Sequence, residues 1–126
     1  MLNFEHLKLI KNENRKKIID IERGDLPYPS LNEVNFLAFN ESDDEYHNEL
    51  YGYIESESEL NNYQKGQSTV PYIKTRNDGR NITTQIIMSE YIRHQIHHPD
   101  NTSNARFTFE ELQQSIKDMR IFIQNL

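Results

Sequence analysis

Apolar side chains recur every three or four residues near the end of the chain, and this spacing constrains the fold more than any other feature. The recurring residues are Phe109, Leu112, Ile116, Met119 and Ile123. Side chains at such intervals lie on one face of a helix. Thr108 and Glu111 have the spacing of a capping box, with Phe107 and Leu112 placed as its hydrophobic staple. The sequence therefore predicts a terminal helix with one buried face.

A second helix is predicted immediately before this one, over residues 82–98. Its apolar residues form pairs four apart: Ile82 and Ile86, Met88 and Ile92, and Ile92 and Ile96. Residues at that spacing share a helix face. Pro99 ends the helix, since its ring disfavours helical geometry at His98 and it has no N–H to donate.

The upstream part of the chain is predicted to be helical as well, in three segments. Residues 4–22 show helical spacing around a basic centre and are followed by glycine and prolines typical of turns. Ser30 and Glu33 fit another capping box, which opens a helix over residues 31–38. Residues 46–60 form the third segment.

Residues 61–79 are the least regular stretch. They include an Asn-Asp-Gly turn, and only residues 70–75 have strand character. We expect a loop here, with a brief hairpin as the alternative. Five or so helices with short connections predict an all-α bundle. A chain of 126 residues suits one domain, residues 1–126.

The charge of the chain is distributed unevenly. The net charge is -6, and between Glu41 and Glu59 there are eight acidic residues and no lysine or arginine. Such a run repels a phosphate backbone and is usually a solvated face. A hydrophobic fraction of 35% indicates a thin core, which favours a partner or a dimer.

Composition also bears on the compartment. No run of eighteen apolar residues exists, so no membrane span is expected. The N-terminus has charges where a signal peptide needs an apolar segment. There is no cysteine, which removes disulfides and thiolate metal sites. We expect a cytoplasmic protein.

Histidines and an arginine gather in the segment YIRHQIHHPDN, residues 91–101. The guanidinium of Arg93 stays charged and suits phosphate oxygens, while the imidazole of His98 exchanges a proton near neutral pH. Together they supply what cleavage of an RNA phosphodiester by its own 2′-hydroxyl needs, without a metal.

Helical geometry leaves the choice of histidine open. On an ideal helix Arg93 and His98 lie about 140° apart, whereas His97 lies about 40° from Arg93. Unwinding at Pro99 would bring Arg93 and His98 together. A metal site that uses His94, His97, His98 and Asp100 is another alternative, because imidazoles one turn apart can share a Zn²⁺ ion.

The motif and its surroundings resemble those of HEPN domains, helical bundles of prokaryotic toxin and abortive-infection systems. The family motif is an arginine, a polar residue, three or more further residues and a histidine, which Arg93, His94 and His98 match. The resemblance covers about residues 82–125, including the terminal helix FTFEELQQSIKDMRIFI. Many members carry a tyrosine two places after the histidine, where this chain has Asp100.

The resemblance implies an all-α bundle and a metal-independent endoribonuclease that needs no cofactor. It further implies a homodimer with a composite cleft, in which Arg93 stabilises the transition state, His98 is the acid or base and His94 orients the phosphate. Glu90 would hold Arg93 by an i,i+3 pair.

The family setting also suggests partners. The partner protein that it suggests is either an antitoxin of nucleotidyltransferase type or an ATPase. The alternative is a non-catalytic HEPN-like subunit of a defence complex, which the acidic run and Asp100 favour.

Overall fold

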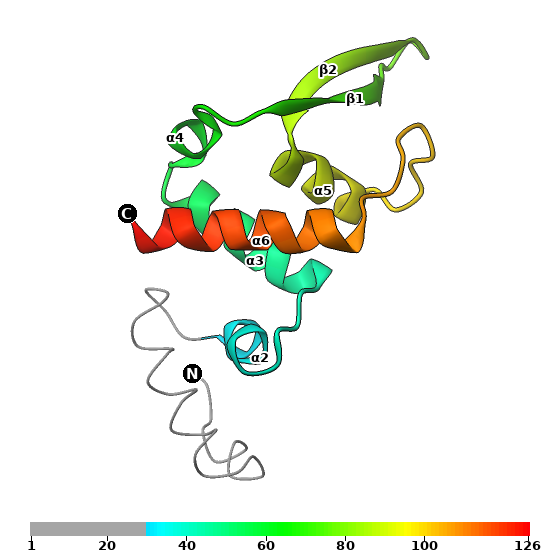
Figure 1. Cartoon of the computed structure of the whole chain (residues 1–126). Coiled ribbons are helices and arrows are strands. Elements are labelled where there is room, and N and C mark those ends of the chain that lie inside the picture. Colours follow the sequence, from blue (N-terminus) through cyan, green and yellow to red (C-terminus); the bar gives the residue numbers. More distant parts are fainter. Residues whose placement is uncertain (1–29) are drawn as a thin grey trace.

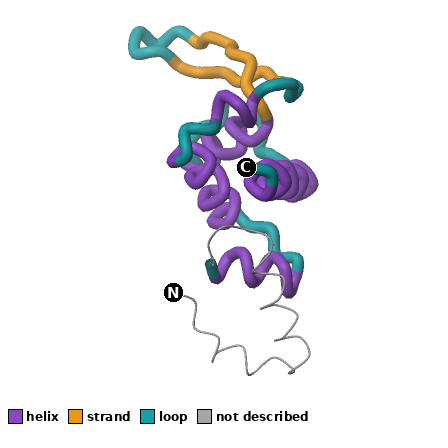
Figure 2. Tube along the Cα trace, turned by 90° about the vertical axis from the view of Figure 1, so that its left-hand side faces the viewer, coloured by secondary structure: helices purple, strands orange, loops and turns teal. Residues whose placement is uncertain are grey.

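The computed structural model describes residues 30–126, which form five helices and one antiparallel two-stranded sheet. In chain order the elements are α2 (Leu31–Phe39), α3 (Asp44–Ser56), α4 (Leu60–Gln64), β1 (Thr69–Thr75), β2 (Asn81–Ile87), α5 (Met88–His97) and α6 (Phe109–Gln124). α6 crosses the middle of the molecule and packs against α3 and α5 (Figure 1). α2 packs on α3, and the hairpin of β1 and β2 lies over α5 and projects past it (Figures 1 and 2).

The core lies where α3, α5 and α6 meet. Its fully buried apolar side chains are Tyr46, Leu50, Ile54, Ile92, Ile116 and Met119. Tyrosines supply much of the remaining buried surface: Tyr51, Tyr63, Tyr72 and Tyr91. Large aromatic groups thus compensate for the low apolar content that the sequence shows.

The prediction of an all-α fold is wrong, because residues 69–87 form a β-hairpin. β1 pairs with β2 from Thr69 opposite Ile87 to Thr75 opposite Asn81. The turn between them contains Gly79, whose φ of 84° lies in the left-handed region that favours glycine. The stretch expected to be a loop, with a brief hairpin as the alternative, supplies β1 and the turn, whereas β2 lies in the segment predicted to be helical.

The predicted helix over residues 82–98 is half strand and half helix. Its first six residues belong to β2, and α5 starts only at Met88. Ile82 and Ile86 misled the prediction because residues four apart share a face on a strand as well as on a helix. The β-branched residues from 82 to 87 favour the strand, where such side chains pack without the crowding of a helical turn.

The terminal helix is confirmed together with its cap. The Thr108 hydroxyl accepts from the Glu111 N–H at 3.1 Å, and the Glu111 carboxylate accepts from the Thr108 N–H at 2.7 Å. Phe107 and Leu112 are both buried. Phe109 is 54% exposed, so the buried face of α6 begins at Leu112, one turn later than the spacing of the apolar residues predicts.

The other predicted helices match in part. Residues 31–38 correspond to α2, but residues 46–60 are divided between α3 and α4. Ser58 has a φ of 59°, which breaks the helical path between them. The predicted helix over residues 4–22 lies outside the described residues.

Half of the expected capping box at α2 is present. Ser30 accepts from the Glu33 N–H at 3.0 Å, and its hydroxyl donates to the Glu49 carboxylate. The Glu33 side chain does not complete a box. It is fully buried and accepts from Arg120 of α6 at 3.0 Å, and Arg120 also donates to the Tyr46 hydroxyl at 2.8 Å. The ion pair therefore joins α2 to α6, and the hydrogen bond to Tyr46 joins α6 to α3.

Candidate functional site

The motif lies on the second half of α5, whose C-terminal end is shaped by Pro99. His98 has φ −128° and ψ 67°, outside the helical region, as expected for a residue before proline. Its backbone N–H still donates to the His94 carbonyl at 2.9 Å. The helix therefore ends at the position that the sequence predicts, with His98 as its cap.

Arg93 points from α5 toward α3. Its guanidinium lies 4.6 Å from the centre of the Tyr51 ring, and its Nη2 is 3.7 Å from Oε1 of Glu55. The side chain is 24% exposed. The carboxylate that pairs with Arg93 is therefore that of Glu55. The sequence predicted Glu90 instead. Burial raises the pKa of Tyr51 to about 12, so its ring faces the guanidinium as a neutral phenol.

His94 joins α5 to the hairpin. Its ring stacks on Tyr72 of β1 with 5.1 Å between ring centres, and its Nε2 is 3.5 Å from Oε2 of Glu90. Burial lowers the pKa of His94, and the nearby positive charge of Lys74 lowers it further, while Glu90 acts in the opposite direction. Glu90 therefore holds a histidine of the motif, not its arginine.

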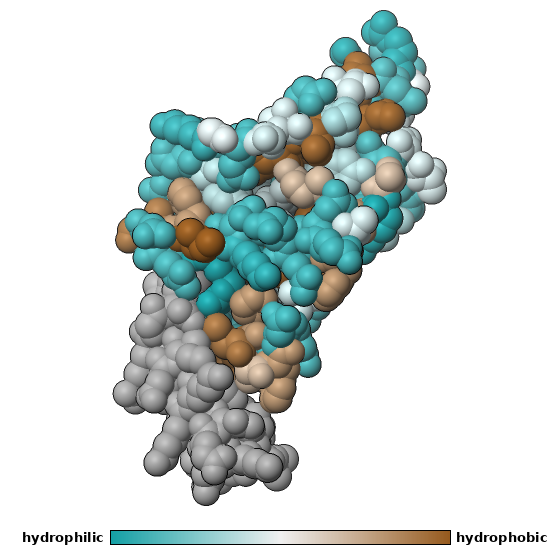
Figure 3. Space-filling view, in the orientation of Figure 1, coloured by the Kyte–Doolittle hydropathy of each residue, from teal (hydrophilic) through white to brown (hydrophobic). Residues whose placement is uncertain are grey.

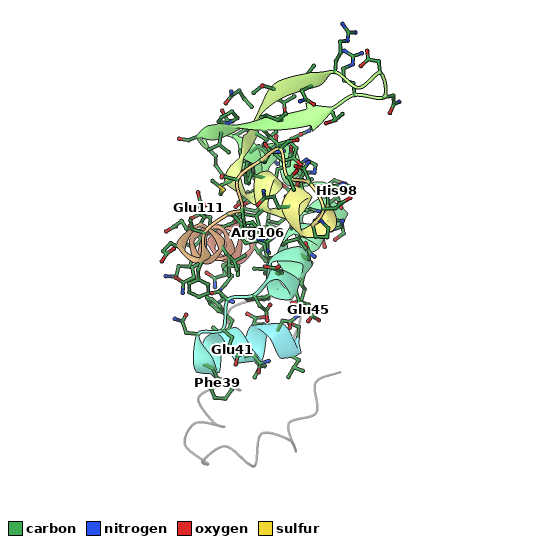
Figure 4. All side chains as sticks on the ribbon, turned by 90° about the vertical axis from the view of Figure 1, so that its right-hand side faces the viewer. Phe39, Glu41, Glu45, His98, Arg106 and Glu111 are labelled. Atoms are coloured by element: carbon green, nitrogen blue, oxygen red, sulfur yellow. The ribbon has the colours of Figure 1, made fainter. Side chains whose placement is uncertain are left out.

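His97 and His98 are both exposed at the end of α5. In Figure 4, His98 lies between the hairpin above and Glu45 of α3 below. Within residues 30–126 neither imidazole makes a hydrogen bond or an ion pair through its side chain. Both are therefore accessible to a ligand.

The structure places the five predicted site residues along α5 and at its C-cap, but it does not bring Arg93 and His98 into contact. Arg93 is turned toward α3, and His98 caps the helix at its solvent end. Among the described residues, no group of three or more His, Asp or Glu side chains is arranged to hold a metal ion.

The loop after the motif is held by side chains whose role no pattern in the sequence indicates. Asn104 accepts from the Ile73 N–H at 2.8 Å and donates to the Ile73 carbonyl at 3.0 Å. Gln95 donates to the Ala105 carbonyl at 2.8 Å, and Tyr91 donates to the same carbonyl. The loop is thereby fixed to both the hairpin and α5.

A buried polar chain beneath α5 was also missed. The His47 Nε2 lies 2.7 Å from the Ser115 hydroxyl, which lies 2.6 Å from Ser89, which in turn lies 2.8 Å from the Tyr63 hydroxyl. Burial, together with the positive charge of Arg93, lowers the pKa of His47 to about 3. The signal in the sequence is a histidine in step with Leu50, Tyr51 and Ile54 on the buried face of a helix.

A hollow with a volume of ≈ 660 Å³ lies at the opposite end of α5 from the motif. Its lining residues include Tyr63, Lys65, Met88, Asp118 and Phe122. None of the predicted site residues lines it, so this hollow and the motif are separate features.

Comparison of the chain with models of protein families, with curated proteins and with solved structures found no match. None of the helices in residues 30–126 has the length and apolar character needed to span a bilayer.

Proposed function

We propose that this chain is a metal-independent endoribonuclease of a bacterial toxin or anti-phage defence system, active as a homodimer. One observation carries the proposal: the last turns of α5 present an oriented guanidinium and two exposed imidazoles. The resemblance to HEPN domains also supports the proposal, because the residues that carry it lie on α5, the following loop and α6. The all-α bundle that the family implies is not part of the proposal.

In this reaction the 2′-oxygen of the RNA attacks the adjacent phosphorus and the bond to the 5′-oxygen breaks. A base takes the proton of the 2′-hydroxyl, and an acid protonates the leaving 5′-oxygen. Arg93 stabilises the charge on the phosphorane, His98 is the acid or base, and His94 orients the phosphate. His97 remains the second candidate for proton transfer. The products are a 2′,3′-cyclic phosphate and a 5′-hydroxyl.

The contacts of Arg93 suit this role. Tyr51 and Glu55 fix the direction of the guanidinium, which reduces the entropy lost when phosphate binds. The long 3.7 Å pair with an exposed carboxylate is weak enough for phosphate to replace it. Arg93 and His98 make no contact within residues 30–126 of one copy, so in this proposal the cleft is shared by two copies, as the resemblance implies.

The test is RNA cleavage in EDTA by the wild type, by Arg93→Ala and by His98→Ala. We expect each variant to be slower by at least about 100-fold. Arg106→Ala removes an arginine on the loop after α5 and should cleave like the wild type. Equal cleavage by all four proteins, or none by the wild type, would refute the proposal. His97→Ala decides between the two histidines.

A non-catalytic subunit of a defence complex is the second candidate. The observation that favours it is the set of exposed carboxylates on and around α3, including Glu41 and Glu45 (Figure 4). This function requires a partner with a basic surface. A stable complex with such a protein, without RNA cleavage after its removal, would establish it in place of the enzyme.

A further inference from the structure

The hairpin of β1 and β2 extends past the helices on the side where α5 ends (Figures 1 and 2). Side chains alternate along a strand, so residues two apart share a face. Tyr72 of β1 is buried against Tyr91 and stacks on His94. Its face is therefore the inner face of the hairpin, which looks toward α5.

The inner face becomes basic as it passes the end of α5. Lys74 follows Tyr72 on this face, and Ile82 lies opposite it, 41% exposed. Arg76 continues the alternation, because its N–H donates to the Arg80 carbonyl at 2.7 Å and prolongs the ladder. From the helices outward, the β1 side of the inner face thus carries Tyr72, then Lys74, then Arg76. Tyr72 is buried, and the two cations are exposed.

These two cations differ from the third basic residue of the hairpin. Arg80 pairs with Asp78 at 2.9 Å. Lys74 and Arg76 take part in no ion pair within residues 30–126. Their charge is therefore available to a ligand, whereas that of Arg80 is largely neutralised.

The surrounding charge directs an anion to the hairpin. Residues 69–87 carry three basic side chains and one acidic one, whereas residues 30–65 carry nine acidic side chains and one lysine. A polyanion is repelled from α3 and attracted to the hairpin. In Figure 3 the outer end of the hairpin is mostly hydrophilic.

The hairpin is fixed in relation to the motif. Asn104 makes two hydrogen bonds to the free edge of β1 at Ile73, as a neighbouring strand would. Tyr72 and His94 stack beneath it. Lys74 is near enough to His94 for its charge to disfavour the imidazolium. The basic face and the end of α5 thus form two sides of one site.

We propose that Lys74 and Arg76 on the inner face of the hairpin bind backbone phosphates of a single-stranded RNA whose scissile bond lies at the end of α5. This inference rests on the proposed function for the identity of the substrate, but binding can be measured without cleavage. Neither residue transfers a proton. They bind phosphates next to the bond that is cut.

The test uses a 2′-O-methyl RNA oligonucleotide, which lacks the attacking hydroxyl and cannot be cleaved. Its affinity is measured by fluorescence anisotropy over a range of salt for the wild type and for Lys74→Gln with Arg76→Gln. We expect the double variant to bind at least tenfold more weakly. The slope of log affinity against log salt should fall by about 1.4, which corresponds to two phosphate contacts on a single strand.

The matched control is Lys65→Gln with Lys117→Gln, which removes the same charge from the C-cap of α4 and from α6. Affinity and slope close to those of the wild type are expected. Equal losses in the two double variants would overturn the inference, because net charge alone would then explain binding. Unchanged RNA affinity with loss of the dimer on sedimentation would also overturn it, since the hairpin would then bind a second copy.

The two proposals fail separately. Cleavage by the wild type with RNA affinity that does not depend on Lys74 and Arg76 removes the inference and leaves the enzyme. Hairpin-dependent binding without any cleavage removes the enzyme and leaves an RNA-binding hairpin.

Discussion

Two arginine–glutamate pairs in this protein have the same chemistry and opposite surroundings. Arg120 and Glu33 are 3.0 Å apart, and their side chains are 8% and 0% exposed. Arg93 and Glu55 are 3.7 Å apart, and theirs are 24% and 56% exposed. The first pair joins α2 to α6 inside the core, whereas the second lies at the surface between α3 and α5. Burial, and not the type of residue, separates a structural ion pair from one that a ligand can replace.

The physical reason is the difference in solvation. A buried charge that loses its partner keeps the cost of leaving water, so the remaining charge is strongly destabilising. An exposed charge that loses its partner is solvated by water, so little free energy is lost. The pair at α5 can therefore open for a phosphate without weakening the fold.

The largest expected effect is on the buried pair. Arg120→Ala leaves Glu33 without this cation and should lower the free energy of unfolding by about 3–5 kcal/mol. Urea denaturation measures it. Arg106→Ala, which removes an exposed partner of Asp44, should change stability by about 1 kcal/mol or less. Equal losses in the two variants would show that burial does not distinguish the pairs.

The buried polar chain gives the next effect, which depends on pH. The pKa of His47 is about 3 in the folded protein, below its value of about 6.5 in the unfolded chain. As pH falls below about 6.5, the unfolded chain binds a proton that the folded protein does not. Stability should therefore decrease by about 1.4 kcal/mol per pH unit for this group.

Urea denaturation at several pH values between about 7 and 5 measures this dependence. His47→Gln should reduce the slope, whereas His97→Gln, at an exposed position, should keep it. If stability depends on pH equally in the wild type and in both variants, the fold does not prevent protonation of His47, and the prediction is wrong.

The smallest effect is expected at the exposed pair. Glu55→Gln should lower the free energy of unfolding by less than about 1 kcal/mol. Glu33→Gln is the same substitution in the buried pair and should cost several times more. A loss at Glu55 that equals the loss at Glu33 would mean that the Arg93 pair is structural, and would weaken the argument that phosphate replaces its carboxylate.

Two local signals in the sequence predicted helix boundaries correctly. The capping box of Thr108 and Glu111 and the stop at Pro99 both lie where expected. Each signal is complete within a few neighbouring residues, so tertiary contacts are not needed to interpret it. The candidate site was also placed on one helix for this reason, because Arg93, His94, His97 and His98 follow one another closely.

The assignment of helix or strand before α5 failed for a different reason. Residues 82 and 86 share a face in a strand as well as in a helix. The contacts that decide for the strand come from β1, where Lys74 lies opposite Ile82 and Val70 lies opposite Ile86. The sequence also could not predict which charged side chains lie next to each other in the fold. Glu33 and Arg120 are 87 residues apart in the chain, and only packing of α2, α3 and α6 brings them together.

The sequence by itself thus determined the terminal helix, the helix end that carries the motif and the acidic character of the α3 region, since each depends on neighbouring residues. The tertiary structure decided that residues 69–87 form a hairpin, that Arg93 faces Glu55 and that His47 is buried. These depend on which surfaces exclude water, and a surface excludes water only when segments far apart in the chain pack together.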